Sequence, residues 1–376
     1  MEHRRRTAVV LAGVGVGLLT SCTAQQPAPA TSPSDPAPTT ATATARATPT
    51  RPGPAAPTGT PAVVTTGLEA PWSVVFHDGT PLISERDSGR VLELADDGSA
   101  RAIGTVDGVV ASGEGGLLGL ALDDRDRLYA YSTAADGNRV QRFTVTGSAG
   151  SLSLGQPETL LDGLPSAGIH NGGRIAFGPD DLLYVTVGDA GQPDRAQDLE
   201  SLGGKILRMT ADGDVPADNP FPDSLVYSSG HRNPQGLAWA DDGTMFASEF
   251  GQNTWDELNV ITPGANYGWP TVEGIGNDQD FTDPVQQWEP SAASPSGITH
   301  ADGTIFIANL RGQVLQAVPV ADPTTSTEHY LREYGRIRDV TVAPDGQLWL
   351  VTSNTDGRGT PGPDDDRILS VRLERG

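Results

Sequence analysis

The chain downstream of about residue 62 consists of short apolar segments separated by tight turns. Segments such as Leu183–Val187 and Leu348–Thr352 are rich in Val, Leu and aromatic side chains, and Gly, Asp or Asn residues flank them closely. Short strands between turn residues are typical of antiparallel sheets, and long helical periodicity is scarce. The pattern therefore predicts an all-β domain.

One hairpin recurs six times. In each copy an apolar strand leads to a turn with Asp-Gly or an equivalent, and the return strand has an aromatic residue near its start in every copy but the first. The copies are Ser73–Ser84, Leu118–Ser132, Ile175–Asp189, Gly236–Phe250, Gly297–Leu310 and Val340–Ser353. Asp-Gly between alternating strands is a strong hairpin signal. Six such units predict a six-bladed β-propeller, whereas the alternative, two packed β-sandwiches, would not require so regular a unit.

The N-terminal residues have the pattern of an export signal. A basic stretch, His3–Arg6, precedes an apolar run, Ala8–Leu19, that is too short to span a bilayer comfortably. The run ends in Leu19-Thr20-Ser21-Cys22, which resembles the lipobox of bacterial lipoproteins. The resemblance implies a signal peptide at residues 1–21, lipidation of Cys22, and an extracytoplasmic protein that is lipid-anchored to the bacterial cell membrane. An ordinary secretory signal with an incidental cysteine is the alternative.

Composition separates a tether from the folded domain. Residues 22–61 are mostly Ala, Thr, Pro, Ser and Gln, which predicts a disordered tether, and residues 62–376 are expected to form the propeller. Cys22 is the only cysteine of the chain, which excludes internal disulfides and thiolate metal clusters. The formal net charge of −23 repels phosphate backbones and argues against nucleic-acid binding.

The register of the six copies predicts that polar residues gather on one face of the propeller. The first strand of each copy runs toward the turn and the second returns, so residues before the first and after the second share the opposite face. These residues are Glu114, His170, Arg232, Glu249, Arg311, Arg336 and Arg338. Polar groups from several blades around a central depression form a candidate pocket.

Two clusters on this face suggest chemistry. His170 lies in the motif His170–Arg174 and suits a general base, because histidine titrates near neutrality; a structural hydrogen-bonding histidine is the alternative. Arg232 lies in the polar cluster His231–Gly236, and the arginines of this face together suit a small polyanion, because guanidinium groups bind carboxylates through two donors. Salt bridges between blades are the alternative for the arginines.

Acidic, glycine-rich loops follow the fourth hairpin copy. Glu249–Gln252, Asp256–Asn259 and Gly264–Pro270 offer carboxylates and exposed carbonyls, which are hard oxygen ligands suited to Ca²⁺. The six histidines have no paired spacing, which argues against zinc. An ordinary acidic loop is the alternative to a calcium site.

Several segments, in order, resemble signatures of the glucose/sorbosone dehydrogenase family. They are GEGGLLGLAL (113–122), HNGGRIAFGPDDLLYVTVGD (170–189), GGKILRM (203–209), GHRNPQGLAW (230–239), DELN (256–259), GANYGWP (264–270) and RIRDV (336–340). The resemblance covers about Val63–Leu373. It implies a six-bladed propeller that uses pyrroloquinoline quinone (PQQ) and Ca²⁺. Such an enzyme oxidises the anomeric hydroxyl of aldose sugars to lactones and passes electrons to an external acceptor.

The resemblance also implies roles for individual residues. His170 would be the catalytic base, and the cofactor would be bound by Glu114, Arg232, Asn233, Arg311, Arg336 and Arg338. Gly251 and Gln252 would offer backbone carbonyls to a catalytic calcium. Asp256, Glu257 and the Tyr267 carbonyl would hold a second, structural calcium.

Three positions depart from the family pattern. Arg311 stands in place of a lysine, Glu114 in place of a glutamine, and Ile169 in place of the acidic residue before the base. From Ile169 we expect His170 to lack a carboxylate partner, and the departures together argue against specificity for glucose. The insertions between blades are also shorter than the family pattern, which suggests a more open pocket and broader aldose use. Two other functions fit a propeller: a non-catalytic carbohydrate- or protein-binding module on the cell surface, and a calcium-dependent lactonase, which would need neither quinone nor arginine cluster.

Overall fold

The computed structural model describes residues 53–376, so the predicted signal peptide, Cys22 and residues 22–52 of the predicted tether lie outside the described residues. Residues 53–376 belong to one compact unit. The described part contains β-strands and one short 3-10 helix, η1 (Pro193–Ala196), and no α-helix. Among these residues no helix is long and apolar enough to cross a membrane.

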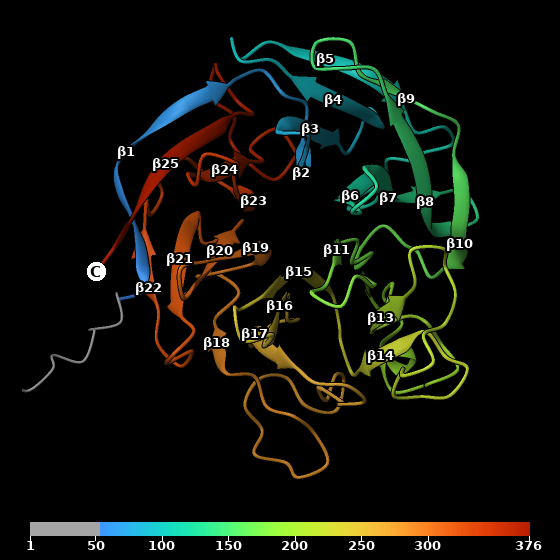
Figure 1. Cartoon of the computed structure of the whole chain (residues 1–376). Coiled ribbons are helices and arrows are strands. Elements are labelled where there is room, and N and C mark those ends of the chain that lie inside the picture. The colour runs from blue at the N-terminus through green and yellow to red at the C-terminus, as the bar shows by residue number, and fades with distance from the viewer. Residues whose placement is uncertain (1–52) are drawn as a thin grey trace, which may run out of the picture. The chain divides into compact units, whose positions relative to one another are not determined.

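Six antiparallel sheets surround a central axis (Figure 1). The strands of each blade are given from the axis outward. Blade 1 consists of β2 (Pro71–His77), β3 (Thr80–Glu85), β4 (Arg90–Leu94) and β5 (Ala100–Thr105). Blade 2 consists of β6 (Leu117–Leu122), β7 (Arg127–Ala134), β8 (Gly137–Thr146) and β10 (Glu158–Leu164), and β9 (Ser153–Leu154) pairs with β8; blade 3 consists of β11 (Ile175–Phe177), β12 (Leu183–Val187), β13 (Lys205–Met209) and β14 (Val226–Ser229). Blade 4 consists of β15 (Pro234–Trp239), β16 (Met245–Glu249), β17 (Asp256–Ile261) and β18 (Gln286–Trp288). Blade 5 consists of β19 (Pro295–Ala301), β20 (Thr304–Asn309), β21 (Val314–Pro319) and β22 (Thr327–His329). Blade 6 consists of β23 (Ile337–Val342), β24 (Leu348–Thr352), β25 (Ile368–Arg375) and β1 (Ala55–Thr65). The predicted six-bladed β-propeller is confirmed.

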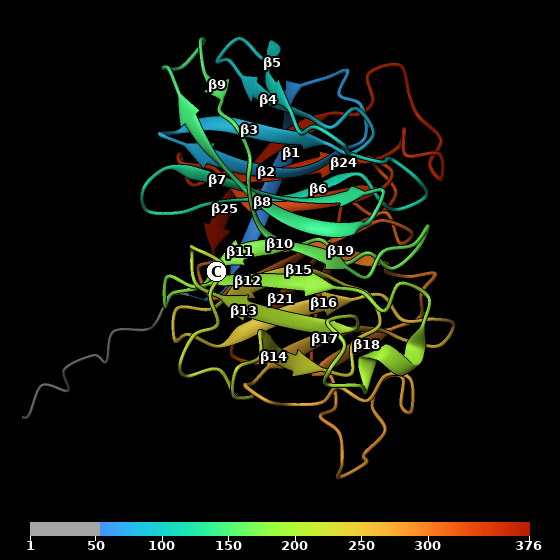
Figure 2. The same ribbon diagram turned by 90° about the vertical axis from the view of Figure 1, so that its right-hand side faces the viewer.

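The predicted hairpins are the two inner strands of each blade. They are β2–β3, β6–β7, β11–β12, β15–β16, β19–β20 and β23–β24. Turn residues such as Asp78, Asp181 and Asp302 have φ of 47°, 59° and 46°, a left-handed conformation that aspartate tolerates. We call the face that carries these turns the turn face and the opposite face the rim face; the side view shows strands running between the two (Figure 2).

The first described strand closes the ring. β1 pairs with β25 from Ala55↔Arg375 to Thr65↔Ile368 and supplies the outer strand of blade 6. The prediction of a disordered tether over residues 22–61 is therefore wrong for the residues of β1, because pairing covers the otherwise open edge of β25. The Ala55 N–H also donates to the Asp302 carbonyl at 3.2 Å, so β1 starts on the turn face.

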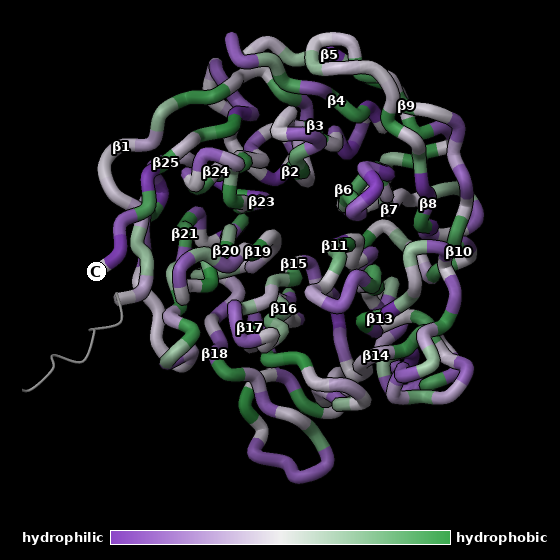
Figure 3. Tube along the Cα trace, viewed as in Figure 1, coloured by the Kyte–Doolittle hydropathy of each residue, from purple (hydrophilic) through white to green (hydrophobic). Residues whose placement is uncertain are grey.

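The core consists of apolar contacts between neighbouring blades. In one cluster Leu118 and Tyr131 of blade 2 pack with Val185 and Leu207 of blade 3, and all four are almost completely buried. Hydrophobic stretches follow the strands, and hydrophilic ones lie mostly in connecting loops (Figure 3). Each sheet thus buries its faces against its neighbours, which explains why one blade could not be stable alone.

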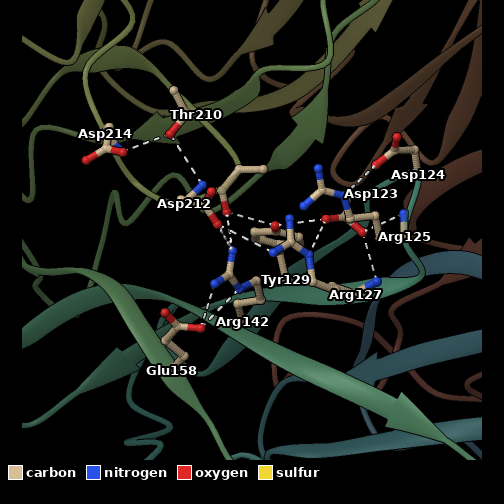
Figure 4. A network of polar contacts seen from close by, with 11 residues as sticks. Asp123, Asp124, Arg125, Arg127, Tyr129, Arg142, Glu158, Thr210, Asp212 and Asp214 are labelled. Carbon is tan, nitrogen blue, oxygen red and sulfur yellow. Dashed lines mark hydrogen bonds and ion pairs between the residues drawn. The ribbon is translucent and has the colours of Figure 1, made fainter.

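Blades 2 and 3 are also joined by a polar clasp on the turn face, formed by Tyr129, Arg142, Glu158, Ala211 and Asp212 (Figure 4). Arg142 Nη2 lies 2.6 Å from Glu158 Oε2, and Nη1 donates to the Ala211 carbonyl at 2.7 Å. Burial raises the pKa of Tyr129 to about 12, so its hydroxyl stays protonated and lies 2.8 Å from the same carbonyl. Arg142 Nη1 also pairs with Asp212 of blade 3, so a salt bridge joins the two blades, but it lies on the face opposite the predicted pocket.

A buried ion pair, here called the axis pair, lies among the innermost strands. Arg174 precedes β11, and its Nη2 lies 3.1 Å from Asp339 Oδ1 of β23. Arg174 also donates to the Gln235 carbonyl at 3.0 Å and to Ser73 Oγ at 3.3 Å. A Cβ at Gly297 would lie 1.8 Å from Asp339 Oδ1, so that position leaves room only for glycine. The axis pair thus contacts five of the six blades.

Candidate functional site

His170 lies on the rim face and is held in an uncommon backbone conformation. Its φ is +56°, in the left-handed region that residues other than glycine seldom adopt. Its N–H donates to Glu114 Oε2 at 2.8 Å, and its carbonyl accepts the Ala190 N–H at 3.1 Å. A Cβ at Gly188 would lie 2.0 Å from the His170 carbonyl oxygen, so the close approach requires that glycine. Such strained positions persist only where the surroundings fix them, and they are common at functional sites.

Asp189 is the carboxylate partner of His170, so the expectation that Ile169 leaves the base without one is wrong. His170 Nδ1 lies 2.7 Å from Asp189 Oδ1, which also accepts the Gly191 N–H at 2.7 Å; Oδ2 accepts the indole N–H of Trp269 at 2.9 Å. Burial alone would raise the pKa of Asp189, but the contact with His170 and the two other donors outweigh burial, and the pKa is lowered. Because Asp189 is ionised, Nδ1 carries the imidazole proton and Nε2 is the basic nitrogen.

Arg232 and Asn233 connect blade 4 to this pair. Asn233 Oδ1 accepts the Gly172 N–H at 2.9 Å, and the Asp189 N–H donates to the Arg232 carbonyl at 2.8 Å. Arg232 Nη1 donates to the Gly251 carbonyl at 2.6 Å. Burial lowers the pKa of Arg232 despite the carboxylates around it, so its positive charge is incompletely compensated.

Arg336 and Arg338 share one carboxylate. Asp356 Oδ2 lies 2.9 Å from Arg336 Nη2 and 3.8 Å from Arg338 Nη2. Arg338 Nη1 also donates to Gln235 Oε1 at 2.9 Å and to Ser296 Oγ at 3.2 Å. Burial lowers the pKa of Arg338 to about 9, although Asp356 opposes the shift. This side of the pocket therefore also holds buried positive charge in excess of its local carboxylate.

Glu114 links these two arginines to the base. Its Oε1 lies 3.3 Å from Arg358 Nη2, and the Arg358 N–H donates to Asp356 Oδ1 at 2.9 Å. The structure thus brings His170, Glu114, Arg232, Asn233, Arg336 and Arg338 into one polar network. Arg311 is the predicted cofactor residue outside it: the side chain is exposed at the rim end of β20, and the ion pairs among the described residues do not include it.

Four donors of the predicted cofactor-binding residues are buried without a hydrogen-bond partner within residues 53–376. They are Arg232 Nε, Asn233 Nδ2, Arg336 Nε and Arg338 Nε. Buried polar groups are nearly always paired in folded proteins, and an unsatisfied one costs about 1–3 kcal/mol, more if it is charged. A bound group with several acceptor oxygens would satisfy these donors and the excess charge together.

The predicted metal ligands lie partly around a small cavity. Gly251, Glu257 and Tyr267 line it, together with Glu249 and Glu273. Burial, followed by the charge of Glu249, raises the pKa of Glu257 to about 8. Carboxylates around one cavity are the hard oxygen ligands that Ca²⁺ prefers, although no group of three His, Cys, Asp or Glu in the described chain already has the geometry of a metal site.

Two other predicted metal ligands do not line this cavity. Gln252 is exposed, and its N–H donates to Glu273 Oε1 at 2.6 Å. Asp256 Oδ1 accepts the Gly251 N–H at 2.9 Å, and Oδ2 accepts the Ser294 N–H at 2.6 Å. Burial raises the pKa of Asp256 to about 6. Since both of its oxygens already bind backbone donors, Asp256 braces the loop that contains Gly251.

Residues of the network that were not predicted as site residues include Asp189, Trp269, Asp356 and Arg358. Asp189 follows β12, the return strand of the hairpin beside His170, where the register argument already places side chains on the rim face. Trp269 and Asp356 lie in the long connections after β17 and β24. The path of such loops has no local sequence pattern, so only the fold reveals these two contacts.

The fold and this face define a class: a six-bladed β-propeller with a histidine–aspartate pair that hydrogen bonds and ion pairs connect to buried arginines. The chain belongs to the glucose/sorbosone dehydrogenase family, whose family model, "Glucose / Sorbosone dehydrogenase", matches residues 68–361.

Three similar proteins are named as sugar dehydrogenases. Aldose sugar dehydrogenase YliI of Escherichia coli (strain K12) is 30% identical over 331 residues, which cover 77% of this chain and 89% of that protein. Quinoprotein glucose dehydrogenase B of Acinetobacter calcoaceticus is 34% identical over 259 residues, 58% of this chain but only 54% of that protein. The structure of the PQQ-bound aldose sugar dehydrogenase from Streptomyces coelicolor has 48% identity and a TM-score of 0.81, covering 87% of this chain and 100% of that one.

Proposed function

We propose that this chain is an oxidoreductase that uses PQQ and Ca²⁺ to oxidise the anomeric hydroxyl of aldose sugars to lactones, and that it passes the electrons to an external acceptor. Family membership and the sugar dehydrogenases similar to it support the reaction class, and the PQQ-bound Streptomyces coelicolor structure supports the cofactor. The observation that carries the proposal is the His170–Asp189 pair beside a pocket of unsatisfied buried donors.

The pocket residues fit PQQ, a small quinone with three carboxylates. Arg232, Arg336 and Arg338, with Asn233, would bind those carboxylates through the donors that now lack partners, and hydrogen bonds between ionised groups are the strong ones. When bound, PQQ would supply the acceptor for the hydride that leaves the sugar.

His170 acts on the substrate proton. Because Nδ1 is held by Asp189, Nε2 is the nitrogen that accepts the proton of the anomeric hydroxyl. The ionised Asp189 stabilises the imidazolium that results. Removal of this proton increases the electron density on the anomeric carbon and so favours loss of its hydride. The imidazole is only 12% exposed, which limits access of water to it.

Calcium and the membrane anchor complete the proposal. Ca²⁺ would be held at the cavity beside Gly251, chiefly by Glu273, whose hydrogen bonds within the described residues all reach Oε1 and leave Oε2 available. Glu249 and Glu257 also line this cavity, and they would have to give up present hydrogen bonds to bind the ion. A lipid anchor at Cys22 would hold the propeller at the outer side of the bacterial cell membrane.

Reconstitution tests the proposal. Purified protein is incubated with PQQ and Ca²⁺ and offered a panel of aldoses together with a reducible dye. We expect sugar-dependent dye reduction that requires both additions and is lost with a chelator. If PQQ neither binds nor supports dye reduction, the proposal is eliminated. Binding of sugar without any oxidation would favour the non-catalytic module instead.

Arg338→Met is expected to weaken PQQ binding by about 10- to 100-fold, because a hydrogen bond between charged groups is worth about 1.5–3 kcal/mol. The measurement is a titration of folded protein, followed by quinone absorbance. Arg142→Met, in the polar clasp on the turn face, is the matched control and should bind PQQ like the wild type. Equal affinities for the Arg338→Met variant and the wild type would contradict the assignment.

A further inference from the structure

We propose that Trp269 is a positioning residue that couples the catalytic base to the anion-binding Arg232, an inference that rests on the proposed function. Its indole N–H holds Asp189, and thereby His170, while its ring holds the guanidinium of Arg232. Trp269 belongs to the connection after β17 in blade 4, whereas His170 and Asp189 belong to blade 3. The residue acts through these neighbours rather than on the substrate.

The Asp189 carboxylate is fixed by a different partner on each oxygen. Oδ1 lies 2.7 Å from His170 Nδ1, and Oδ2 accepts the Trp269 indole N–H at 2.9 Å. The Asp189 side chain is 0% exposed, so water cannot replace the indole donor. Without that donor the carboxylate could rotate about its own bond, and its hold on one imidazole tautomer would weaken.

The same indole ring lies against Arg232. The guanidinium carbon is 5.4 Å from the ring centroid, a cation–π geometry. Arg232 Nη1 is held by the Gly251 carbonyl at 2.6 Å, while Nε has no partner among the described residues. Ring and carbonyl together restrict the guanidinium and leave Nε as the donor for a bound anion.

Trp269 is itself held before any ligand binds. The backbone N–H of Trp269 donates to the Gly230 carbonyl at 3.0 Å, and Gln197 Nε2 donates to the backbone carbonyl of Trp269 at 2.6 Å. Gln197 directly follows η1, whose Ala196 carbonyl accepts the buried Lys205 Nζ at 3.0 Å. Supporting contacts of this kind are what keep functional side chains in a productive geometry.

Trp269→Phe tests the inference, because it removes the indole N–H donor and keeps a smaller aromatic ring. In ¹⁵N-histidine-labelled protein without PQQ, imidazole ¹⁵N shifts report the tautomer of His170, and His170→Ala identifies its signals. We expect the Nδ1–H tautomer in the wild type and a mixture in the variant. Trp269→Leu also lacks the indole donor and should give the same mixture of His170 tautomers. Either variant therefore tests whether the indole N–H fixes the tautomer. This result does not depend on PQQ or turnover and stands even if the proposed function fails.

Loaded enzyme separates the two contacts of Trp269. Trp269→Phe is expected to lower kcat about tenfold, from loss of a hydrogen bond to a charged group, with less than a twofold change in PQQ affinity. Trp269→Leu also removes the ring and should weaken PQQ binding about three- to thirtyfold. Trp239→Phe, whose ring packs against Tyr184 at 5.1 Å, is the control and should change neither quantity. A folded Trp269→Phe protein with the wild-type tautomer and wild-type kcat would overturn the inference.

Discussion

His170→Ala is expected to lower kcat for aldose oxidation by about 10²–10⁴-fold, the usual contribution of a positioned general base. The reason is specific to this geometry: Asp189 holds Nδ1, so that Nε2 is the only imidazole nitrogen free to take the substrate proton. Alanine removes that proton acceptor. Asp189 contacts Nδ1, on the side of the imidazole away from Nε2, and is therefore not positioned to replace it. The measurement is dye reduction at saturating sugar, with PQQ occupancy determined on the same sample.

Two controls separate a catalytic from a structural loss. His300→Ala changes a histidine that lies 3.7 Å from Asp241 on the turn face, and it should keep wild-type turnover. The His170→Ala protein should still bind PQQ, because the unsatisfied donors belong to Arg232, Asn233, Arg336 and Arg338. If the His170→Ala protein binds PQQ and keeps full turnover, the base is another residue.

The fold could be predicted from the sequence because its unit is local. Each Asp-Gly turn fixes two neighbouring strands within about 15 residues, and repetition then determines how many blades must pack. The same register placed His170, Arg232 and Arg338 on one face. β1 was missed because its strand character depends on an edge more than 300 residues away: Ala55 pairs with Arg375.

The contacts that organise the site were harder to predict. Ile169 suggested a base without a carboxylate, because the position directly before His170 has no acidic side chain. Asp189 reaches His170 from the return strand of the same hairpin, and Trp269 reaches Asp189 from another blade. Side chains brought together by loop paths and blade packing have no spacing rule, so only the three-dimensional structure assigns them.

Arg174→Met is expected to lower the free energy of unfolding by about 3–5 kcal/mol, the usual effect of breaking a buried ion pair. Asp339 is 4% exposed, and its other oxygen accepts the Val74 N–H at 3.3 Å. Methionine fills much of the space against Trp72, whose ring centroid lies 4.3 Å from the guanidinium carbon. The loss therefore comes from a buried carboxylate left without its cation, and denaturant unfolding measures it.

The loss should depend on pH in a defined direction. Burial already raises the pKa of Asp339, although Arg174 opposes the shift, and removing Arg174 raises this pKa further. A carboxyl whose pKa is higher in the folded than in the unfolded state stabilises the fold only while protonated. Stability is therefore lost as the pH rises above the ordinary aspartate range, and the variant should be closer to the wild type in acid than at neutral pH.

Two further variants test whether the effect belongs to the axis pair. Asp339→Asn in the Arg174→Met background removes the stranded charge and should recover part of the lost stability, a non-additive result of about 0.5–3 kcal/mol. Arg142→Met breaks an ion pair whose partners Glu158 and Asp212 are 61% and 63% exposed, so it should change stability by about 1 kcal/mol or less. Equal losses for Arg174→Met and Arg142→Met, or no recovery in the double variant, would show that the six blades do not depend on a charge pair at their centre.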